Sequence, residues 1–417
     1  MRVLHASYSF NQGGAATAAR RLCEAQFDLG LEVETLAMSN SSLSLPIPQY
    51  RTGGRRHTVR GKVENNLLTA LRLNDQNPRS LGLLPSDVPR MVKKLDPDVL
   101  QLHWMGASSI AGWQARRLAT PTVWRLPDLW PVAGSLHYPI SPQLPLDRKA
   151  RTAFASQWTR RSRALEATLK RLNGAPRVNI RLIATSPWMQ QQIREEMARP
   201  GIEITEIPNA VPTHIFQPGS RDQARLSVGL EVGRPLVGFL STFDASSIIK
   251  GAHLLPEIMQ VVRQRVPDAL LATLDKSAQR TRSEAARHHF DSVISLPFTA
   301  SESTLAAYYQ SFDIVIVPSI IDAFNQVAAE AMSCGIPIVA FDNSGPGSLI
   351  QQETTGLKVK AFDTEEFGQS VAALLEDLKA RDEMGLHARR VAENLWSYTE
   401  VAKHYDLLYQ ELLTGSK

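Results

Sequence analysis

Cysteine is nearly absent from this sequence, since Cys23 and Cys334 are the only two among 417 residues. Two thiols so far apart in the chain make neither a metal-ligand motif nor a disulfide framework. We expect both to be small buried residues in a reducing compartment, and we expect no zinc site.

Long apolar runs are lacking as well. No segment approaches the roughly 20 consecutive apolar residues that span a bilayer. The first apolar run starts at Met1 and reaches the polar Asn11 and Gln12 too soon for a signal-peptide core. These absences predict a cytoplasmic protein whose only membrane contact is peripheral, at the inner face of the cytoplasmic membrane. Internal repeats and low-complexity tracts are also missing.

What remains is an ordinary globular composition with 43% hydrophobic and 21% charged residues. A chain of 417 residues is too long for one compact core, so two domains are expected.

Charge is distributed unevenly between the two halves. Residues 1–208 contain 28 Lys and Arg against 16 Asp and Glu, a net charge of +12, whereas the rest contain 18 against 25, a net charge of −7. The excess is concentrated in two clusters: Arg51, Arg55, Arg56, Arg60 and Lys62, and then Arg148, Lys149, Arg151, Arg160, Arg161, Arg163, Lys170 and Arg171. This pattern predicts an anionic partner, such as an anionic membrane surface into which Phe154 and Trp158 would insert as apolar anchors. The alternative is that the basic residues form a solvated surface without a partner. No nucleic-acid partner is expected, because no binding motif is present and the second half is acidic.

Short apolar strands alternate with helical stretches throughout the chain. Most of the strands are continuous Val, Ile, Leu and Ala runs, which is typical of strands buried on both faces of a parallel sheet. The strands are expected at 2–7, 31–38, 97–103, 121–126, 179–185, 203–207, 235–241, 269–274, 292–296, 313–317, 336–341 and 356–360. This rhythm predicts an α/β protein with two doubly wound Rossmann-like domains facing across a cleft, which is the default ligand site.

The turn-forming segment 208–212 lies near the midpoint and is expected to be the linker. The first domain then covers 1–207, with a C-terminal amphipathic helix, 397–417, that opens on a capping-box pattern at Ser397. The second domain covers 208–396. The stretch from Ser39 to about Asn77 has weak periodicity and predicts a long mobile loop beside a short helix.

The segment from Pro318 to Pro337 indicates a strand–loop–helix unit. A strand ends at Val317, apolar residues then recur at helical spacing, and Gly335 ends the helix. Its amino end points out of the carboxyl edge of the sheet, where phosphates bind in open α/β folds. In a continuous helix Asp322 and Glu330 would be about 12 Å apart. Glu330 has no Lys or Arg at i±3 or i±4, so no local ion pair explains it and another partner is expected. In the alternative interpretation Asp322 is a helix N-cap and Glu330 is a carboxylate at the rim of the site.

Residues Pro318 through Gly335 resemble the acid-x7-acid signature of the family-4 retaining glycosyltransferases of the GT-B fold, in particular the exopolysaccharide (colanic-acid-like) branch. Other motifs occur in the order seen in that family. They are the double-glycine loop Gly13-Gly14, the Trp-rich acceptor-side block 124–138, the linker 207–211, the pair Lys250-Gly251 and the turns 344–346 and 355–356.

The resemblance implies a nucleotide-sugar donor, UDP- or GDP-linked, with no other cofactor and no metal. Asp322 would contact the sugar, Glu330 the ribose and Lys250 the diphosphate. Further donor contacts are expected from Gly13, Gly14, Phe298, Thr299, Phe324 and Asn325. The catalytic set would be Asp322, Lys250, Asp128 and His137, and acceptor contacts are expected from His103, Trp104 and Trp130.

The sequence departs from the family at two points. The segment 240–244 lacks an Arg that commonly precedes the Lys-Gly pair, and Pro127 stands before Asp128 where many members have a His. The expectation is a retaining hexosyltransferase that acts on an oligosaccharide or lipid-linked acceptor in bacterial surface-polysaccharide synthesis. The alternatives are a nucleotide-sugar epimerase on the same scaffold and a nucleotide-sugar-binding or scaffolding protein that has lost catalysis.

Overall fold

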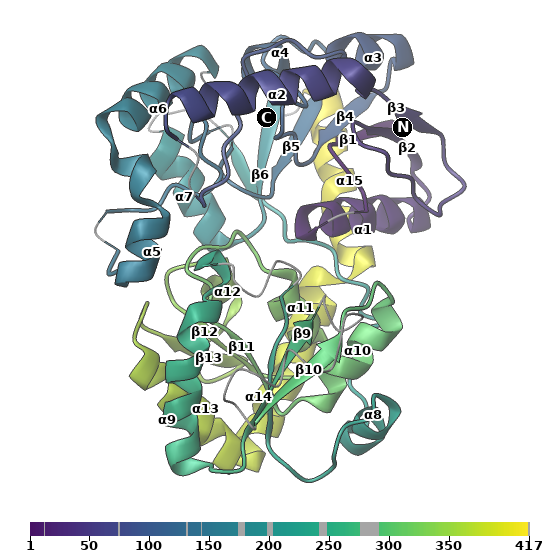
Figure 1. Ribbon diagram of the computed structural model, residues 1–417. Helices are drawn as coiled ribbons and strands as arrows, with labels where there is room; N and C mark the ends of the chain where they lie inside the picture. The colour runs from purple at the N-terminus through teal and green to yellow at the C-terminus, as the bar shows by residue number, and fades with distance from the viewer. Residues whose placement is uncertain are drawn as a thin grey trace. The chain divides into compact units, whose positions relative to one another are not determined.

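The computed structural model describes residues 1–11, 13–73, 76–130, 132–142, 144–173, 180–197, 203–241, 248–275 and 292–415. The chain divides into two compact units (Figure 1). Unit 1 comprises Met1–Ala210 and Tyr398–Lys417, and unit 2 comprises Val211–Ser397. The division after Ala210 falls inside the turn-forming segment 208–212.

Unit 1 is built on a seven-stranded parallel sheet with the order β3-β2-β1-β4-β5-β6-β7. Its strands are β1 (Arg2–Ser7), β2 (Glu32–Ala37), β3 (Gln49–Arg51), β4 (Val99–Leu102), β5 (Thr122–Leu126), β6 (Ile180–Ala184) and β7 (Ile204–Glu206). The helices are α1 (Gly14–Asp28), α2 (Gly54–Ala70), α3 (Val88–Leu95), α4 (Gly112–Ala115), α5 (Arg148–Ala153), the 3-10 helix η1 (Ala155–Trp158), α6 (Arg160–Asn173), α7 (Pro187–Met197) and α15 (Tyr398–Thr414).

The region between Ser39 and Asn77 differs from the sequence prediction. It contains the edge strand β3 and the 17-residue helix α2, rather than a long loop beside a short helix. The strand was missed because it has only three residues. The helix was missed because few of its side chains are buried, so its apolar residues do not form the single inward stripe that periodicity detects.

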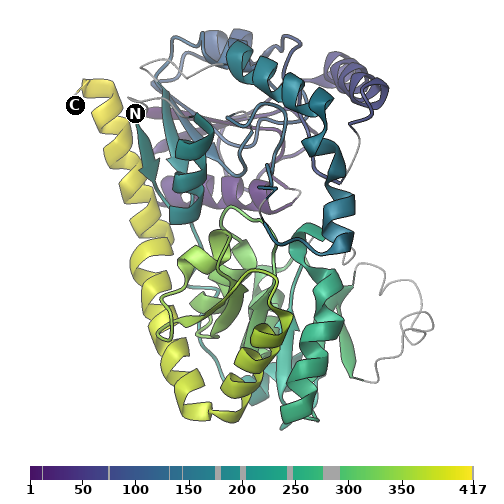
Figure 2. The same cartoon turned by 90° about the vertical axis from the view of Figure 1, so that its left-hand side faces the viewer.

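The amphipathic helix expected after Ser397 is α15, and it belongs to unit 1. Val401, Ala402, Tyr405, Leu408 and Tyr409 are buried on it and share a core with residues of β1, β4, β5 and β6. Figure 2 shows this helix, in yellow, running beside the sheet. No helix of the described residues is long and apolar enough to cross a bilayer.

Unit 2 is built on a six-stranded parallel sheet with the order β10-β9-β8-β11-β12-β13. Its strands are β8 (Leu236–Phe239), β9 (Leu270–Asp275), β10 (Val293–Pro297), β11 (Ile314–Val317), β12 (Ile338–Phe341) and β13 (Gly356–Val359). The helices are α8 (Arg221–Ser227), η2 (Ile248–Lys250), η3 (Ala252–Leu254), α9 (Leu255–Arg265), α10 (Glu302–Ser311), α11 (Gln326–Ser333), α12 (Gly345–Leu349), α13 (Thr364–Glu376) and α14 (Leu378–Trp396).

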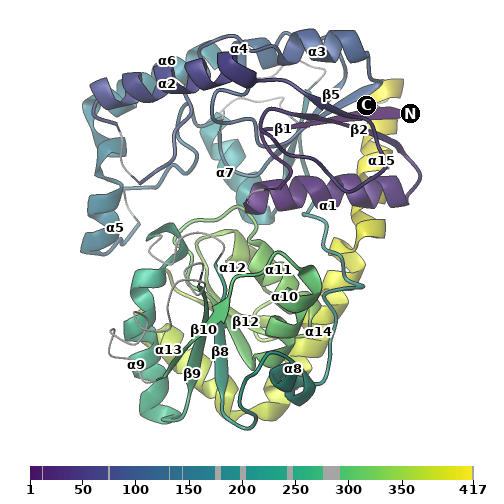
Figure 3. The same cartoon turned by 45° about the vertical axis from the view of Figure 1, so that its right-hand side comes forward.

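The sheet of unit 2 is covered on both faces. One core contains residues of α9 and α13, and the other contains residues of α10, α11 and α14 (Figure 3). Alternate residues of β11 enter opposite cores, Ile314 and Ile316 on one side and Val315 and Val317 on the other. The predicted class, two α/β units with doubly wound parallel sheets, is therefore confirmed.

Candidate functional site

The acidic motif lies at the carboxyl edge of the unit 2 sheet. β11 ends at Val317, residues 318–325 form a loop, and α11 begins at Gln326. Asp322 is thus in the loop and Glu330 is in the helix, so the 12 Å spacing expected for a continuous helix does not apply. The helix starts later because Asn325 has a left-handed backbone, with φ of 71°, that no α-helix continues through.

Asp322 is joined to the neighbouring cation and to the start of α11. The ammonium of Lys250 forms an ion pair with Asp322 Oδ2, and Asn325 Nδ2 donates to the same oxygen at 2.9 Å. Asn325 Oδ1 in turn accepts from the backbone N–H of Ala328 at 2.9 Å, which makes Asn325 the N-cap. The alternative in which Asp322 is the N-cap is therefore wrong. Asp322 is 8% exposed.

Two glycines bring these groups together. Gly251 has φ of 75°, and a Cβ there would lie 1.9 Å from the carbonyl oxygen of Pro318. Gly345 donates its N–H to the Asp322 carbonyl at 2.8 Å, and its Cβ would lie 2.3 Å from the Ala323 carbonyl oxygen. Because any side chain at either position would displace the loop, glycine is required for the Lys250–Asp322 pair to form.

Glu330 occupies a more enclosed position. It is 4% exposed, and the hydroxyl of Tyr309 on α10 donates to its Oε2 at 2.6 Å. Its carboxylate is thus not the rim carboxylate of the alternative interpretation. Tyr309 was not singled out in the sequence, because a partner 21 residues away on another helix leaves no local pattern.

Of the other residues of unit 2 predicted to contact the donor, Phe324 is buried, whereas Phe298 and Thr299 are accessible to solvent. The Phe324 side chain is 2% exposed and packs edge-on against Trp396, with ring centroids 5.9 Å apart, so it is part of the core and cannot contact a donor. Phe298, directly after β10, is 44% exposed, so it is not the buried aromatic that was the alternative. Thr299 is half-buried beside it, and its Oγ1 accepts from Ser301 N–H at 3.0 Å.

Gly13 and Gly14 place the amino end of α1 at the carboxyl edge of the unit 1 sheet. Gly13 is the N-cap residue with φ of 87°, and no atom lies within 4 Å of where a Cβ of either glycine would be. The first turn of this 15-residue helix contains no acid. Its free N–H groups and positive dipole end therefore favour an anion.

Asp128 and His137 meet in unit 1, just beyond β5. His137 Nδ1 lies 2.6 Å from Asp128 Oδ2, and both residues are buried. Trp104 Nε1 donates to the same carboxylate oxygen at 2.7 Å, and the backbone N–H of Trp130 donates to the other at 3.0 Å. The Trp130 ring stacks on His137 at an interplanar angle of 15°.

Ser80 completes this group, although no sequence pattern pointed to it. Its Oγ accepts from Ala107 N–H at 2.8 Å and lies 2.9 Å from His137 Nε2. The hydroxyl proton is therefore free to be donated to His137 Nε2, which leaves the histidine proton on Nδ1, facing Asp128. The Ser–His–Asp order resembles a hydrolase triad, but Ser80 is buried and has no access for a substrate.

His103 belongs to a different network. Arg125 Nε donates to His103 Nδ1 at 3.2 Å, His103 Nε2 lies 2.9 Å from His5 Nδ1, and His5 Nε2 lies 3.0 Å from Gln26 Oε1. Gln26 Nε2 then donates to the hydroxyl of Tyr409 on α15. Both nitrogens of His103 are thus engaged, and the residue is buried, so it cannot contact an acceptor directly. Trp130 is also buried, whereas Trp104 is half-buried.

Burial shifts the pKa of each ionisable group in this network against its charged form. It lowers the pKa of His5 to about 4, with the Arg125 charge as a smaller cause in the same direction. It lowers the pKa of His103 well below the usual 6.5. Both histidines are neutral at pH 7, which agrees with a chain in which each ring donates one hydrogen bond and accepts one.

Among the described residues, one cluster has metal-ligand atom types in mutual reach, namely His5, Cys23 and His103. Their chemistry does not fit a metal. The buried guanidinium of Arg125 would repel a cation, and the ring nitrogens of both histidines already hydrogen-bond. Burial also raises the pKa of the Cys23 thiol, which disfavours the thiolate that binds metals.

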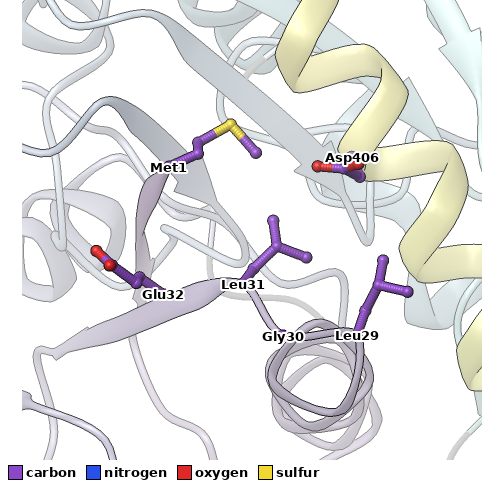
Figure 4. A pocket seen from close by; sticks show the side chains of 6 residues that line it. All are labelled: Met1, Leu29, Gly30, Leu31, Glu32 and Asp406. Carbon is purple, nitrogen blue, oxygen red and sulfur yellow. The ribbon is translucent and has the colours of Figure 1, made fainter.

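A cavity of about 310 Å³ lies at the opposite, amino-terminal edge of the unit 1 sheet. It is lined by Met1, Leu29, Gly30, Leu31, Glu32 and Asp406. Figure 4 shows Leu29 and Leu31 directed toward the space between Met1 and Asp406. This lining contains two acids, no base and no nucleophilic side chain, so the cavity is not part of the candidate site.

Two protein-family models match this chain. The model described as "Glycosyl transferase 4-like domain" matches residues 13–210, and the one described as "Glycosyl transferases group 1" matches residues 234–377. Together they contain Asp128, His137, Lys250, Asp322 and Glu330. The chain is a group 1/group 4-like glycosyltransferase of the GT-B fold.

Individual proteins resemble this glycosyltransferase over nearly its whole length. It is 27% identical over 409 residues to a D-inositol 3-phosphate glycosyltransferase of Pseudarthrobacter chlorophenolicus, covering 94% of this chain and 89% of that protein. The sucrose-phosphate synthase structure of Thermosynechococcus elongatus aligns with a TM-score of 0.72 at 20% identity, covering all of both chains. Anabaena HepE in complex with UDP-glucose aligns with a TM-score of 0.68 at 15% identity, covering 99% of this chain and 100% of that one.

The glycosyltransferase is expected to lose stability as the pH falls below 6.5, because unfolded His5 binds a proton that the native chain excludes until about pH 4. This histidine alone accounts for at most about 3 kcal/mol of unfolding free energy by pH 4. The measurement is the urea midpoint of the wild type, of His5→Gln and of the exposed control His404→Gln at pH 7 and pH 5. The wild type and the control should lose more stability on acidification than His5→Gln. An equal loss in all three would contradict the assignment.

Proposed function

We propose that this glycosyltransferase moves a hexose from a UDP- or GDP-linked donor, with retention at the anomeric carbon and without a metal ion. The acceptor is an oligosaccharide or a lipid-linked saccharide of bacterial surface-polysaccharide synthesis, at the cytoplasmic face of the membrane. The observation that supports the donor chemistry most is the Lys250–Asp322 ion pair beside the amino end of α11. Retention is carried over from the family resemblance.

The leaving group of such a donor is a nucleoside diphosphate, which gains negative charge as the glycosidic bond breaks. Lys250 would donate hydrogen bonds to that diphosphate, and the amino end of α11 would add N–H donors and dipole charge. The donor contacts of Gly13 and Gly14, at the amino end of α1 in unit 1, are carried over from the family resemblance. Asp322 would accept hydrogen bonds from hydroxyls of the sugar. Lys250 and Asn325, which contact the Asp322 carboxylate in this structure, would then also contact the ligand.

The remaining donor contacts concern the nucleoside. Glu330 would accept hydrogen bonds from the ribose while Tyr309 holds its carboxylate in place. The exposed ring of Phe298 offers a stacking surface for the base, with Thr299 beside it. Phe324 supports this site only through its backbone and its packing.

On the acceptor side, the predicted catalytic pair Asp128 and His137 is proposed to position the acceptor by holding Trp104, because both side chains are buried and both ring nitrogens of His137 are engaged. Asp128 fixes the histidine tautomer by accepting its Nδ1 proton, and Trp104 holds the carboxylate. Half-buried Trp104 is the aromatic surface available for a saccharide ring, whereas Trp130 is buried against His137 and His103 is buried beside Arg125.

A second acceptor class is favoured by the curated relative. D-inositol 3-phosphate in its name suggests a small phosphorylated polyol in place of a polysaccharide chain. The basic surface of unit 1 suits an anionic acceptor of either kind. A panel that includes inositol phosphates and lipid-linked saccharides therefore separates the two candidates.

A UDP- or GDP-sugar is expected to raise the melting temperature, because a ligand at 100 times its Kd that binds only the native state adds about 2.7 kcal/mol of stability. Release of UDP or GDP in the presence of an acceptor then measures turnover. Stabilisation without turnover would favour the binding or scaffolding alternative. Absence of both across the whole panel would refute the proposed donor.

Transfer is expected to persist in excess EDTA, since Lys250 and the helix ends supply the positive charge. The one Asp-x-Asp pair of the sequence, Asp96 and Asp98, precedes β4, and Asp98 accepts from Arg2 N–H at 2.7 Å. It is therefore at the edge of the sheet opposite the site. The test compares initial rates with EDTA, Mg²⁺ and Mn²⁺. Complete loss with EDTA and recovery with Mn²⁺ would overturn this account.

The two acids are expected to differ in their kinetic effects. Asp322→Asn should mainly lower kcat, whereas Glu330→Gln should mainly raise the donor KM, because one contacts the reacting sugar and the other the ribose. Each loss is about ten- to a hundredfold, corresponding to roughly 1.5–3 kcal/mol for a charged hydrogen bond. Steady-state kinetics with a melting control provide the measurement. Near-wild-type kcat and donor KM in both variants would show that Asp322 and Glu330 have only structural roles.

A further inference from the structure

Helix α2 has an apolar stripe that faces solvent. Val59, Val63 and Leu67 repeat at i, i+4 and i+8, and their exposed fractions are 58%, 48% and 40%. Figures 1 and 2 show the helix on the outer side of unit 1. Three large exposed aliphatic side chains in one row are unusual on a protein surface, and such patches indicate an interaction site.

Basic residues accompany this stripe. Arg55, Arg56 and Lys62 are exposed, and at 100° per residue they lie with the three aliphatic residues within an arc of about 140°. The only acid of α2 is Glu64, which is buried on the opposite side and accepts from the N–H groups of Leu81 and Gly82. The outer face is therefore cationic and apolar, with Arg56 in loose contact with Asp87 at 3.7 Å.

The inner side of α2 fixes the helix to unit 1. Leu68 packs with Leu73, Leu81 and Leu169 in one core, and the Glu64 hydrogen bonds anchor the preceding turn. The apolar stripe is thus held outward by a buried face that is already complete. Its exposure is a property of the folded unit and not of a loosely attached segment.

The second basic cluster, around α6, lacks such anchors. Arg160, Arg161 and Arg163 are exposed, but the described side chains of α6 include no exposed large hydrophobic residue. Phe154 is fully buried, and the Trp158 indole donates to the Ile140 carbonyl at 3.2 Å with Arg151 over its ring. The prediction that Phe154 is an apolar membrane anchor is therefore wrong, whereas Trp158 is half-buried and its predicted anchor role stays a prediction. Arg60 is also buried and cannot face a membrane.

We propose that the outer face of α2 docks on an anionic lipid surface, with Val59, Val63 and Leu67 entering the headgroup region. The proposal names the lipid partner and so rests on the membrane part of the proposed function, but not on catalysis. On this face the aliphatic row and the cations lie side by side with no acid among them, so the face can contact apolar and anionic parts of a lipid headgroup region together. An acidic protein partner would match the charges but would not require three aliphatic side chains to be desolvated together.

The two kinds of contact make separable contributions. A basic residue close to an anionic leaflet strengthens binding about fivefold, so the three cations supply on the order of a hundredfold. This part weakens as salt shortens the screening length to about 3 Å at 1 M. The apolar part does not depend on salt. Binding is therefore expected to fall with salt and with either set of substitutions.

The first experiment is co-sedimentation of the full chain with vesicles of phosphatidylcholine alone or with 30% phosphatidylglycerol, at low and high salt. The variants are Val59→Gln/Val63→Gln/Leu67→Gln and Arg55→Gln/Arg56→Gln/Lys62→Gln, and the matched control is Arg160→Gln/Arg161→Gln/Arg163→Gln. Wild type and control should bind the anionic vesicles. The apolar variant should lose at least tenfold and the cationic variant about a hundredfold. A larger loss in the α6 control than in either α2 variant, or no wild-type binding, would overturn the proposal.

A second measurement reports insertion itself. Both native cysteines are buried, so Val63→Cys adds one exposed thiol for an environment-sensitive fluorophore. Its emission should rise and shift to the blue with anionic vesicles, whereas a label on Leu226→Cys, exposed on α8 of unit 2, should not respond. No change at Val63 during co-sedimentation would favour a purely electrostatic or protein-like contact and contradict insertion.

Measuring transferase activity beside vesicle binding tests membrane docking and sugar transfer separately. With a water-soluble acceptor, both α2 variants should retain the wild-type kcat, because none of the six residues belongs to the candidate site. Loss of vesicle binding with intact transfer supports docking by α2. Vesicle binding by an enzyme that transfers no sugar would refute the proposed function and leave the docking surface intact.

Discussion

The ion pair between Lys250 and Asp322 is the interaction on which the candidate donor site depends. The two residues are 72 positions apart and come from different loops, so only the fold brings them into contact. The carbonyl of Ile249 accepts from Ile320 N–H at 2.9 Å, which ties the two loops by their backbones as well. Gly251 lies against the backbone of Pro318, and Gly345 lies against the backbone of Ala323. Neither position has room for a Cβ, so any other residue there would move the loops and separate the two charges.

The Lys250–Asp322 pair is only partly exposed to solvent, so the binding of a ligand there must compensate for the ion pair that it disturbs. Each charge is stabilised by the other and costs free energy when its partner leaves. A ligand that gives Lys250 a phosphate and Asp322 a set of hydroxyls replaces both partners at once. The arrangement therefore favours a ligand carrying a phosphate and a sugar together over one carrying either alone.

Unit 1 is organised by buried polar networks. The guanidinium of Arg125 donates to His103, to Asn209 in the turn-forming segment and to the Ala15 carbonyl at the start of α1. The same chain of hydrogen bonds continues through His5 and Gln26 to Tyr409 on α15. A charged group that is fully buried must have all its hydrogen bonds satisfied, so this network fixes the relative positions of α1, β5 and the C-terminal helix.

The sequence by itself determined the class of fold and most of its strands, because strands buried on both faces of a parallel sheet need continuous apolar runs. It also identified the chain as a glycosyltransferase, which the family models over residues 13–210 and 234–377 confirm, whereas the roles of the individual motif residues stay predictions. It failed for β3, a three-residue edge strand, and for α2, whose apolar residues point to solvent. Only the tertiary structure decided that Asn325 and not Asp322 caps α11, that Ser80 meets His137 across 57 residues, and that Phe154 and Phe324 belong to the core. Local patterns report which face of an element is apolar, whereas the partner of a polar group and the exposure of an aromatic ring depend on what the rest of the chain places against it.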